Sequence, residues 1–242
     1  MRVLPIASSS KGNAYVVEQD GAAVLIDCGV SCKCLKAACD VAHLCGILVT
    51  HNHVDHVSGL KRLLNCVDVP VYANAMTAEA VACQEHVDES AFVCFENGQP
   101  FELGPFEIAP FSVPHDAADP VGYLIRGEAT YFHGTDIGTP LDSIGLKLAE
   151  AELATLESNH DPVMLKTSRR PPSLIQRIAG PRGHLSNDQA CDLVRRFASP
   201  RLRHLWLAHL SGECNEPLVA LGAMKDTLLS MGRVDVEVEV AG

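Results

Sequence analysis

Short apolar segments rich in β-branched residues alternate with helical patterns along most of the 242 residues, and this alternation constrains the fold more than any other feature. Gly, Asp or Pro bounds the apolar runs, as is typical of short strands. The expected strands are residues 3–7, 14–18, 23–27, 47–50, 69–73, 101–103, 106–113, 122–126, 130–134, 154–158, 202–208 and 234–240. Helical patterns fall at residues 32–38, 58–65, 76–84, 141–150, 187–198 and 216–231. Strands that alternate with helices predict an α/β fold.

Both halves of the chain, residues 1–120 and 121–242, carry this pattern, and no low-complexity linker separates them. We therefore expect a single domain of two pseudo-repeated halves, with two mixed β-sheets sandwiched between outer helices. Ser186 with Gln189 three residues later predicts a capping box. Asn215 before Glu216 and Pro217 predicts the cap of the last helix.

The composition favours a soluble protein. The first residues lack the basic start and apolar centre of a signal peptide, and no run approaches 18 apolar residues, so we expect a cytoplasmic protein without a membrane partner. Ten cysteines occur without a C-x-x-C pair, which indicates reduced thiols. The sequence leaves the oligomeric state open.

Charge is unevenly distributed. The formal net charge is −11, but residues 161–210 carry nine basic side chains against three acids, a local charge of +6. A basic rim facing a polyanion and a solvated helix face both produce such an asymmetry.

One segment, directly after the expected strand at 47–50, holds three imidazoles and a carboxylate: His51, His53, Asp55 and His56. In extended backbone, side chains at i and i+2 project to the same side, so His51 and His53 converge on one ion. Asp55 and His56, at the following turn, reach a second ion. This H-x-H-x-D-H pattern predicts a centre of two divalent metal ions.

Further candidate residues follow other expected strands. They are Asp27, His115, Asp136, the segment from Glu157 to Asp161, and His209. Sites in α/β sheets gather at the carboxyl ends of the strands, so we expect these side chains to contribute to one site.

In this order, the motifs resemble those of the metallo-β-lactamase superfamily. The matching stretches are Leu-Ile-Asp-Cys-Gly around Asp27, the segment from His51 to His56, Val-Pro-His-Asp around His115, His-Gly-Thr-Asp around Asp136 and Leu-Ala-His-Leu-Ser around His209. Within the superfamily the chain looks most like the YycJ (WalJ) group of bacterial metallo-hydrolases, which are proposed nucleases. That closer resemblance rests on residues 7–14, 115–120, 158–161, 183–187 and 209–211.

The resemblance implies a ligand set. His51, His53 and His115 would hold one ion, Asp55, His56 and His209 the second, and Asp136 would bridge them. Imidazole and carboxylate ligands without a thiolate suit Zn, Mn or Fe. A hydroxide shared by the two ions would be the nucleophile, with Asp55 also counted as catalytic, and Asp27 is expected to orient the histidine segment.

The metal ions alone do not select a substrate, but three features favour a phosphodiester. Ser8, Ser10 and Asn13 belong to a small polar loop that can offer N–H groups to phosphate, although an ordinary β-turn has the same composition. His160 and His184 lie outside the metal set, and Gly183-His184-Leu185-Ser186 resembles the His-Ser-Thr segment of RNase Z relatives. In those relatives the histidine of this segment helps to stabilise or protonate the scissile phosphate. The resemblance therefore makes His184, together with His160, a catalytic candidate.

The third feature is the basic run itself, in which Arg169 and Arg170 are candidates for contact with a DNA or RNA backbone. The favoured hypothesis is a metal-dependent phosphodiesterase or nuclease, DNA exonuclease-like. A small-molecule thioesterase or lactonase, similar to glyoxalase II, is the alternative on the same metal centre. A third hypothesis, a non-catalytic metal-binding module, requires broken ligands, and none is broken here.

Overall fold

The computed structural model describes residues 1–242 and divides the chain into two compact units. The first unit consists of Met1–Ser112 and Ala117–Glu128, with Gly242, and the second of Val113–Asp116 and Ala129–Ala241. No helix is long and apolar enough to cross a membrane.

The first unit is built on a six-stranded sheet whose strands stand in chain order, β1 to β6. The strands of this sheet are β1 (Arg2–Ser9), β2 (Gly12–Gln19), β3 (Ala22–Ile26), β4 (Leu44–Leu48), β5 (Val71–Asn74) and β6 (Phe92–Phe95). The unit also contains β7 (Phe101–Leu103), β8 (Phe106–Ser112) and β9 (Val121–Arg126). Its helices are α1 (Cys32–Ala38), η1 (Val41–His43), α2 (Val54–Val57), α3 (Leu60–Leu64), α4 (Ala75–Glu85) and η2 (Glu89–Ala91).

The pairing of neighbouring strands changes once within this sheet, from antiparallel to parallel. The strands β1, β2 and β3 pair antiparallel, and β3 to β6 pair parallel, so the later strands need helical crossovers. Apolar side chains of the sheet and of α1, α3 and α4, among them Leu25, Leu35, Ile47, Leu60 and Val81, form one buried cluster. The strands β7, β8 and β9 form an antiparallel run in this unit.

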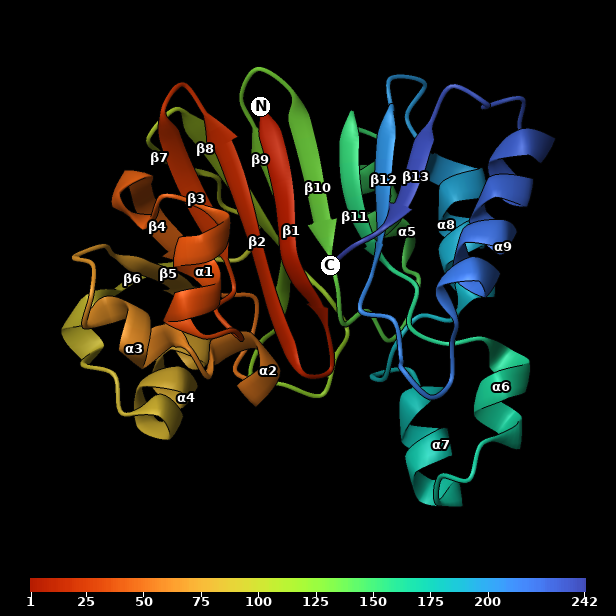
Figure 1. The fold of residues 1–242 in the computed structure, drawn as a ribbon, viewed down its shortest axis with the longest axis horizontal. Helices are drawn as coiled ribbons and strands as arrows, with labels where there is room; N and C mark the ends of the chain where they lie inside the picture. Colours follow the sequence, from red (N-terminus) through yellow and green to blue (C-terminus); the bar gives the residue numbers. More distant parts are fainter. The chain divides into compact units, whose positions relative to one another are not determined.

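The second unit has four parallel strands in chain order. Its elements are β10 (Thr130–Gly134), α5 (Asp142–Leu148), β11 (Leu153–Glu157), α6 (Pro162–Thr167), α7 (Pro172–Ile178), α8 (Asn187–Phe197), β12 (His204–Ala208), α9 (Pro217–Ser230) and β13 (Glu237–Val240). Within this unit α8 and α9 lie side by side and α9 packs along β13, whereas α6 and α7 extend away from the strands (Figure 1).

The backbone is unusual where three strands end. Asp27 after β3, Asp136 after β10 and His209 after β12 have φ of 58°, 56° and 55°. This left-handed region is uncommon for residues other than Gly and costs of the order of 1–3 kcal/mol per residue. All three are site residues predicted from the sequence, so the strain falls where the polar side chains leave the strands.

The predicted mixed α/β architecture is confirmed, with the strands in two sheets. The capping box of Ser186 and Gln189 at the start of α8 is also confirmed. The predicted cap of α9 is wrong, because Glu216 is the N-cap and the Asn215 amide instead donates to the carbonyl oxygens of Ser158 and Asn159. The elements β6, α2, α6 and α7 and the short helices η1 and η2 were not predicted, since each spans seven residues or fewer.

Candidate metal centre

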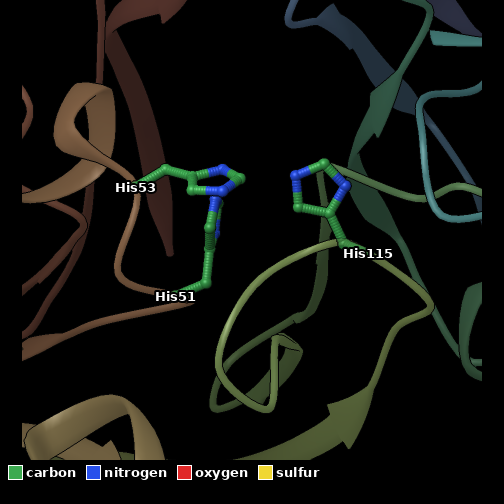
Figure 2. Close-up of side chains that lie close together, drawn as sticks. All are labelled: His51, His53 and His115. Atoms are coloured by element: carbon green, nitrogen blue, oxygen red, sulfur yellow. The ribbon is translucent and has the colours of Figure 1, made fainter. Parts of the chain in front are cut away.

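The histidine loop, residues 50–57, runs from the end of β4 into α2 and belongs to the first unit. His51 and His56 are buried, whereas His53 is partly exposed and is the N-cap of α2. The rings of His51 and His53 lie 4.6 Å apart between centroids, and those of His51 and His56 4.1 Å. Figure 2 shows His51 and His53 on this loop, and His115 on the segment that follows β8.

Asp27 holds this loop in place. Its carboxylate is fully buried and accepts hydrogen bonds from the Thr50 N–H at 2.8 Å, the Thr50 hydroxyl at 2.8 Å and His56 Nδ1 at 2.7 Å. His56 therefore carries its proton on Nδ1, and Nε2 is the lone-pair nitrogen. The single Thr50 hydroxyl hydrogen goes to Asp27, so Thr50 Oγ1 accepts from His51 Nδ1 at 3.0 Å and the lone pair of His51 also lies on Nε2.

The polar hairpin next to the loop contains Ser8, Ser10 and Asn13. It is a tight turn between β1 and β2, with Ser10 exposed and the Ser8 hydroxyl accepting from Tyr15 at 2.6 Å. The Asn13 side chain is fully buried and contacts Asp55 and His56. The first unit thus brings together His51, His53, Asp55, His56, Asp27 and Asn13.

In the second unit the carboxylate of Glu157 organises the cluster; the sequence placed this residue among the strand-end candidates but gave it no specific task. It ends β11, is fully buried, and its Oε1 accepts from His184 Nδ1 at 2.8 Å and His209 Nδ1 at 3.2 Å. Its Oε2 accepts from the backbone N–H groups of Ile137 at 2.7 Å and Leu185 at 3.2 Å. A charged residue ending the apolar run Leu-Ala-Thr-Leu-Glu was the available signal, since a buried carboxylate requires partners.

Asp136 lies in the same cluster. One ligand atom from each of Asp136, Glu157, His184 and His209 falls within 4.8 Å of the others. His115, at the start of this unit, points Nδ1 at the Gly183 carbonyl oxygen, 2.9 Å away, and its Nε2 lies 3.6 Å from Asp136 Oδ1. Asn159 supports His209 by donating to its carbonyl oxygen at 2.7 Å.

The electrostatics of this cluster follow from burial and charge. Burial alone raises the pKa of Glu157, but the charge and hydrogen bond of His184 and the hydrogen bond of His209 outweigh it and lower the pKa. Burial lowers the pKa of His184, yet Glu157 and Asp136 raise it above its usual value. For His160 burial dominates and the pKa is lowered.

The remaining predicted residues differ in their surroundings. His160 is buried, has no hydrogen bond to His184, and its Nδ1 has no hydrogen-bond partner. Arg170 pairs with Glu213 at 3.1 Å, whereas Arg169 is exposed. Arg177 reaches the site from α7 and pairs with Asp116, next to His115, at 2.6 Å.

Comparison with known proteins supports what this fold and these clusters suggest. A family model described as the β-lactamase superfamily domain matches residues 22–209. The exodeoxyribonuclease YycJ of Bacillus anthracis is 34% identical over 238 residues, which cover 94% of this chain and 89% of that protein. The exodeoxyribonuclease WalJ of Streptococcus pneumoniae is 31% identical over 219 residues, covering 87% and 81%.

The fold has a solved counterpart. The metallo-β-lactamase fold protein YhfI from Bacillus subtilis superposes with a TM-score of 0.75 at 19% identity, covering 99% of this chain and 95% of that one. The fold is thus that of the metallo-β-lactamase class, as the motifs predicted. The chain belongs to the β-lactamase superfamily and, within it, to the group that contains YycJ and WalJ.

Proposed function

We propose that this protein is a metal-dependent phosphodiesterase that cleaves nucleic acid, with DNA as the favoured substrate. The names of the similar YycJ and WalJ proteins support a nuclease. The histidine and carboxylate clusters support metal dependence.

One observation carries the metal assignment. In four of the predicted ligand histidines, Nδ1 lies within hydrogen-bonding distance of an oxygen atom. The pairs are His51 with Thr50 Oγ1, His56 with Asp27, His115 with the Gly183 carbonyl, and His209 with Glu157. Metal-binding histidines almost always donate their second ring N–H to such a group, which fixes the ring and leaves the other nitrogen for the ion. The residues present therefore fit divalent metal ions.

The proposed ligands are those implied by the family pattern. His51, His53 and His115 would hold one ion, Asp55, His56 and His209 the other, and Asp136 both. Imidazole and carboxylate donors suit Zn, Mn or Fe. When bound, such a pair of ions lowers the pKa of a water molecule and offsets the charge of the phosphate.

The chain's own residues would orient the reaction. Glu157 holds the Nδ1 proton of His184, so Nε2 of this partly exposed ring is the atom available to a substrate oxygen. In this role His184 would donate a hydrogen bond or a proton to the phosphate or the leaving oxygen. His160, whose Nδ1 lacks a partner, is proposed to bind phosphate.

The basic residues divide into two groups. Arg170, Arg177 and Arg196 are engaged by acidic side chains. Lys166, Arg169 and Arg182, on or beside α6 and α7, are exposed and have no ion-pair partner. We assign contact with the nucleic-acid backbone to this second group, because an unpaired cation does not have to give up an ion pair when it binds phosphate. Ser8 and Ser10 of the hairpin are proposed as further phosphate contacts.

The substrate class can be tested with the purified protein, loaded in turn with Mn²⁺ or Zn²⁺. Labelled single-stranded DNA, double-stranded DNA, RNA and an acyl-glutathione thioester are offered, and Glu157→Gln is assayed beside the native protein. We expect cleavage of DNA that is strongly reduced in the variant. Hydrolysis of the thioester without cleavage of any nucleic acid would instead establish the thioesterase alternative.

A further inference from the structure

The Asn13 amide lies among acceptor atoms next to two of the proposed ligands. Asn13 is fully buried, and its Nδ2 lies 3.1 Å from Asp55 Oδ2, 3.0 Å from His56 Nε2 and 3.0 Å from the Ser9 carbonyl oxygen. All four residues belong to the first unit. An amide nitrogen has two hydrogens, so it cannot satisfy three acceptors at once.

The Ser9 contact fixes the orientation of the amide. A backbone carbonyl oxygen only accepts hydrogen bonds, so the amide atom beside it is nitrogen and not Oδ1. One N–H of Asn13 is thereby committed to Ser9. The other N–H faces both Asp55 Oδ2 and His56 Nε2, and these two atoms are 3.6 Å apart.

A bound ion would determine which of these two acceptors receives the second N–H of Asn13. His56 has its proton on Nδ1, held by Asp27, so Nε2 has a single lone pair, which the ion would take. A carboxylate oxygen has two lone pairs, so Asp55 Oδ2 can bind an ion and still accept from Asn13. The second N–H of Asn13 then belongs to Asp55.

Glycines bring the hairpin close enough for this contact. A Cβ at Gly12 would lie 2.5 Å from the Gly29 carbonyl oxygen, and a Cβ at Gly29 would lie 1.6 Å from that of Asp55. The Gly29 N–H also donates to the Asn13 carbonyl oxygen at 2.8 Å. Close packing at Gly12 and the hydrogen bond from Gly29 therefore fix the position of the backbone at Asn13.

Simple packing does not account for an amide at this position. Asn13 Oδ1 is buried and has no hydrogen-bond partner, which destabilises the folded chain. An apolar side chain of similar size would avoid that destabilisation. The hydrogen bonds that the N–H groups donate therefore explain why an amide occupies this position.

We propose that Asn13 is a positioning residue of the second metal site, where its N–H fixes the Asp55 carboxylate so that one Oδ2 lone pair faces the ion. This rests on the metal assignment within the proposed function, because it takes Asp55 and His56 as metal ligands. It places Asn13 behind the ligands, and not in direct contact with a phosphate.

The test is calorimetric titration of the metal-free protein with Mn²⁺ or Zn²⁺, comparing the native chain with Asn13→Leu. Leu has a similar volume but no donor. The matched control is Gln19→Leu, a buried amide at the other end of β2 that contacts Asp20 and the Glu128 N–H. We expect one of two binding events to weaken roughly 10–100-fold in Asn13→Leu, the usual effect of removing a ligand's supporting partner, and neither to change in the control.

Unchanged affinity for both ions would overturn the proposal, as would equal weakening of both events together with a lower melting temperature, which indicates a structural role. Should Asn13→Leu fail to fold, Asn13→Ala removes the same donors without added bulk and is titrated in its place. Native protein that binds two ions but cleaves no nucleic acid would refute the proposed function and leave this inference intact.

Discussion

At the residue scale, the site depends on groups that hold the histidines as much as on the histidines themselves. A neutral imidazole binds an ion through one nitrogen only if the other carries the proton. Asp27, Thr50 and Glu157 provide the oxygen atoms that fix this choice for His56, His51 and His209.

Asp27→Asn tests this directly. An amide nitrogen turned toward His56 Nδ1 cannot accept its proton, so the proton moves to Nε2 and blocks the atom that we propose binds the metal. We expect metal affinity to fall roughly 10–100-fold, measured by titration of the metal-free protein. Asp20→Asn is the control, because Asp20 also has a positive φ, 52°, but is exposed. Equal affinity in both variants would contradict the assignment.

Glu157→Gln acts on the second unit. Its carboxylate accepts four hydrogen bonds, and an amide can accept at only one end, so two donors lose their partner. We expect the free energy of unfolding to fall by about 1–3 kcal/mol and the cleavage rate by roughly 10–100-fold. Both are measured beside Glu152→Gln, where the carboxylate of a partly exposed residue accepts from the Thr130 N–H. A native cleavage rate in Glu157→Gln would refute its role.

At the element scale, close approach of the hairpin, the end of β3 and the histidine loop sets the position of the proposed ligands in the first unit. Gly29 is the point of closest approach, because a Cβ there would meet the Asp55 carbonyl oxygen. We expect Gly29→Ala to lower the free energy of unfolding by about 1–3 kcal/mol or more, measured by urea denaturation.

Gly222→Ala is the matched comparison for that substitution. Gly222 lies within α9, where a Cβ would meet nothing within 4 Å, so its replacement should stabilise the protein by about 0.5–1 kcal/mol. Equal effects of the two substitutions would show that close approach at Gly29 is not required.

The segment from α6 to Arg182, which includes α7, carries the proposed nucleic-acid contacts. Replacing Lys166, Arg169 or Arg182 by Gln should weaken DNA binding, and each lost phosphate contact should reduce the slope of log affinity against log salt by about 0.7–0.9. Fluorescence anisotropy at several salt concentrations measures both. Arg196→Gln, which removes a cation already paired with Asp142 and Asp192, should leave the slope unchanged. The same slope in all four variants would exclude this segment as the contact surface.

At the scale of the whole molecule, the sequence predicted what depends on local pattern and ordered motifs. The strand and helix alternation predicted the α/β fold, and the apolar runs placed Asp27, Asp136 and His209 at or just after the ends of strands. The contacts of Glu157 with His184 and His209, and those of Asn13 with Asp55 and His56, could not be derived in this way. Their partners lie 20 to 52 residues away from Glu157 and 42 to 43 residues from Asn13, and only the folded chain determines those pairings.

The central claim is that two divalent ions held by these clusters support cleavage of nucleic acid. The most direct test strips the protein with a chelator, restores Mn²⁺, and follows cleavage of labelled DNA by the native chain and by Asp136→Ala, with thermal melting as the check on folding. We predict cleavage that disappears on chelation, returns with the ion, and falls roughly a hundredfold or more in a folded Asp136→Ala variant. Cleavage that persists without metal, or at the native rate in Asp136→Ala, would contradict the claim.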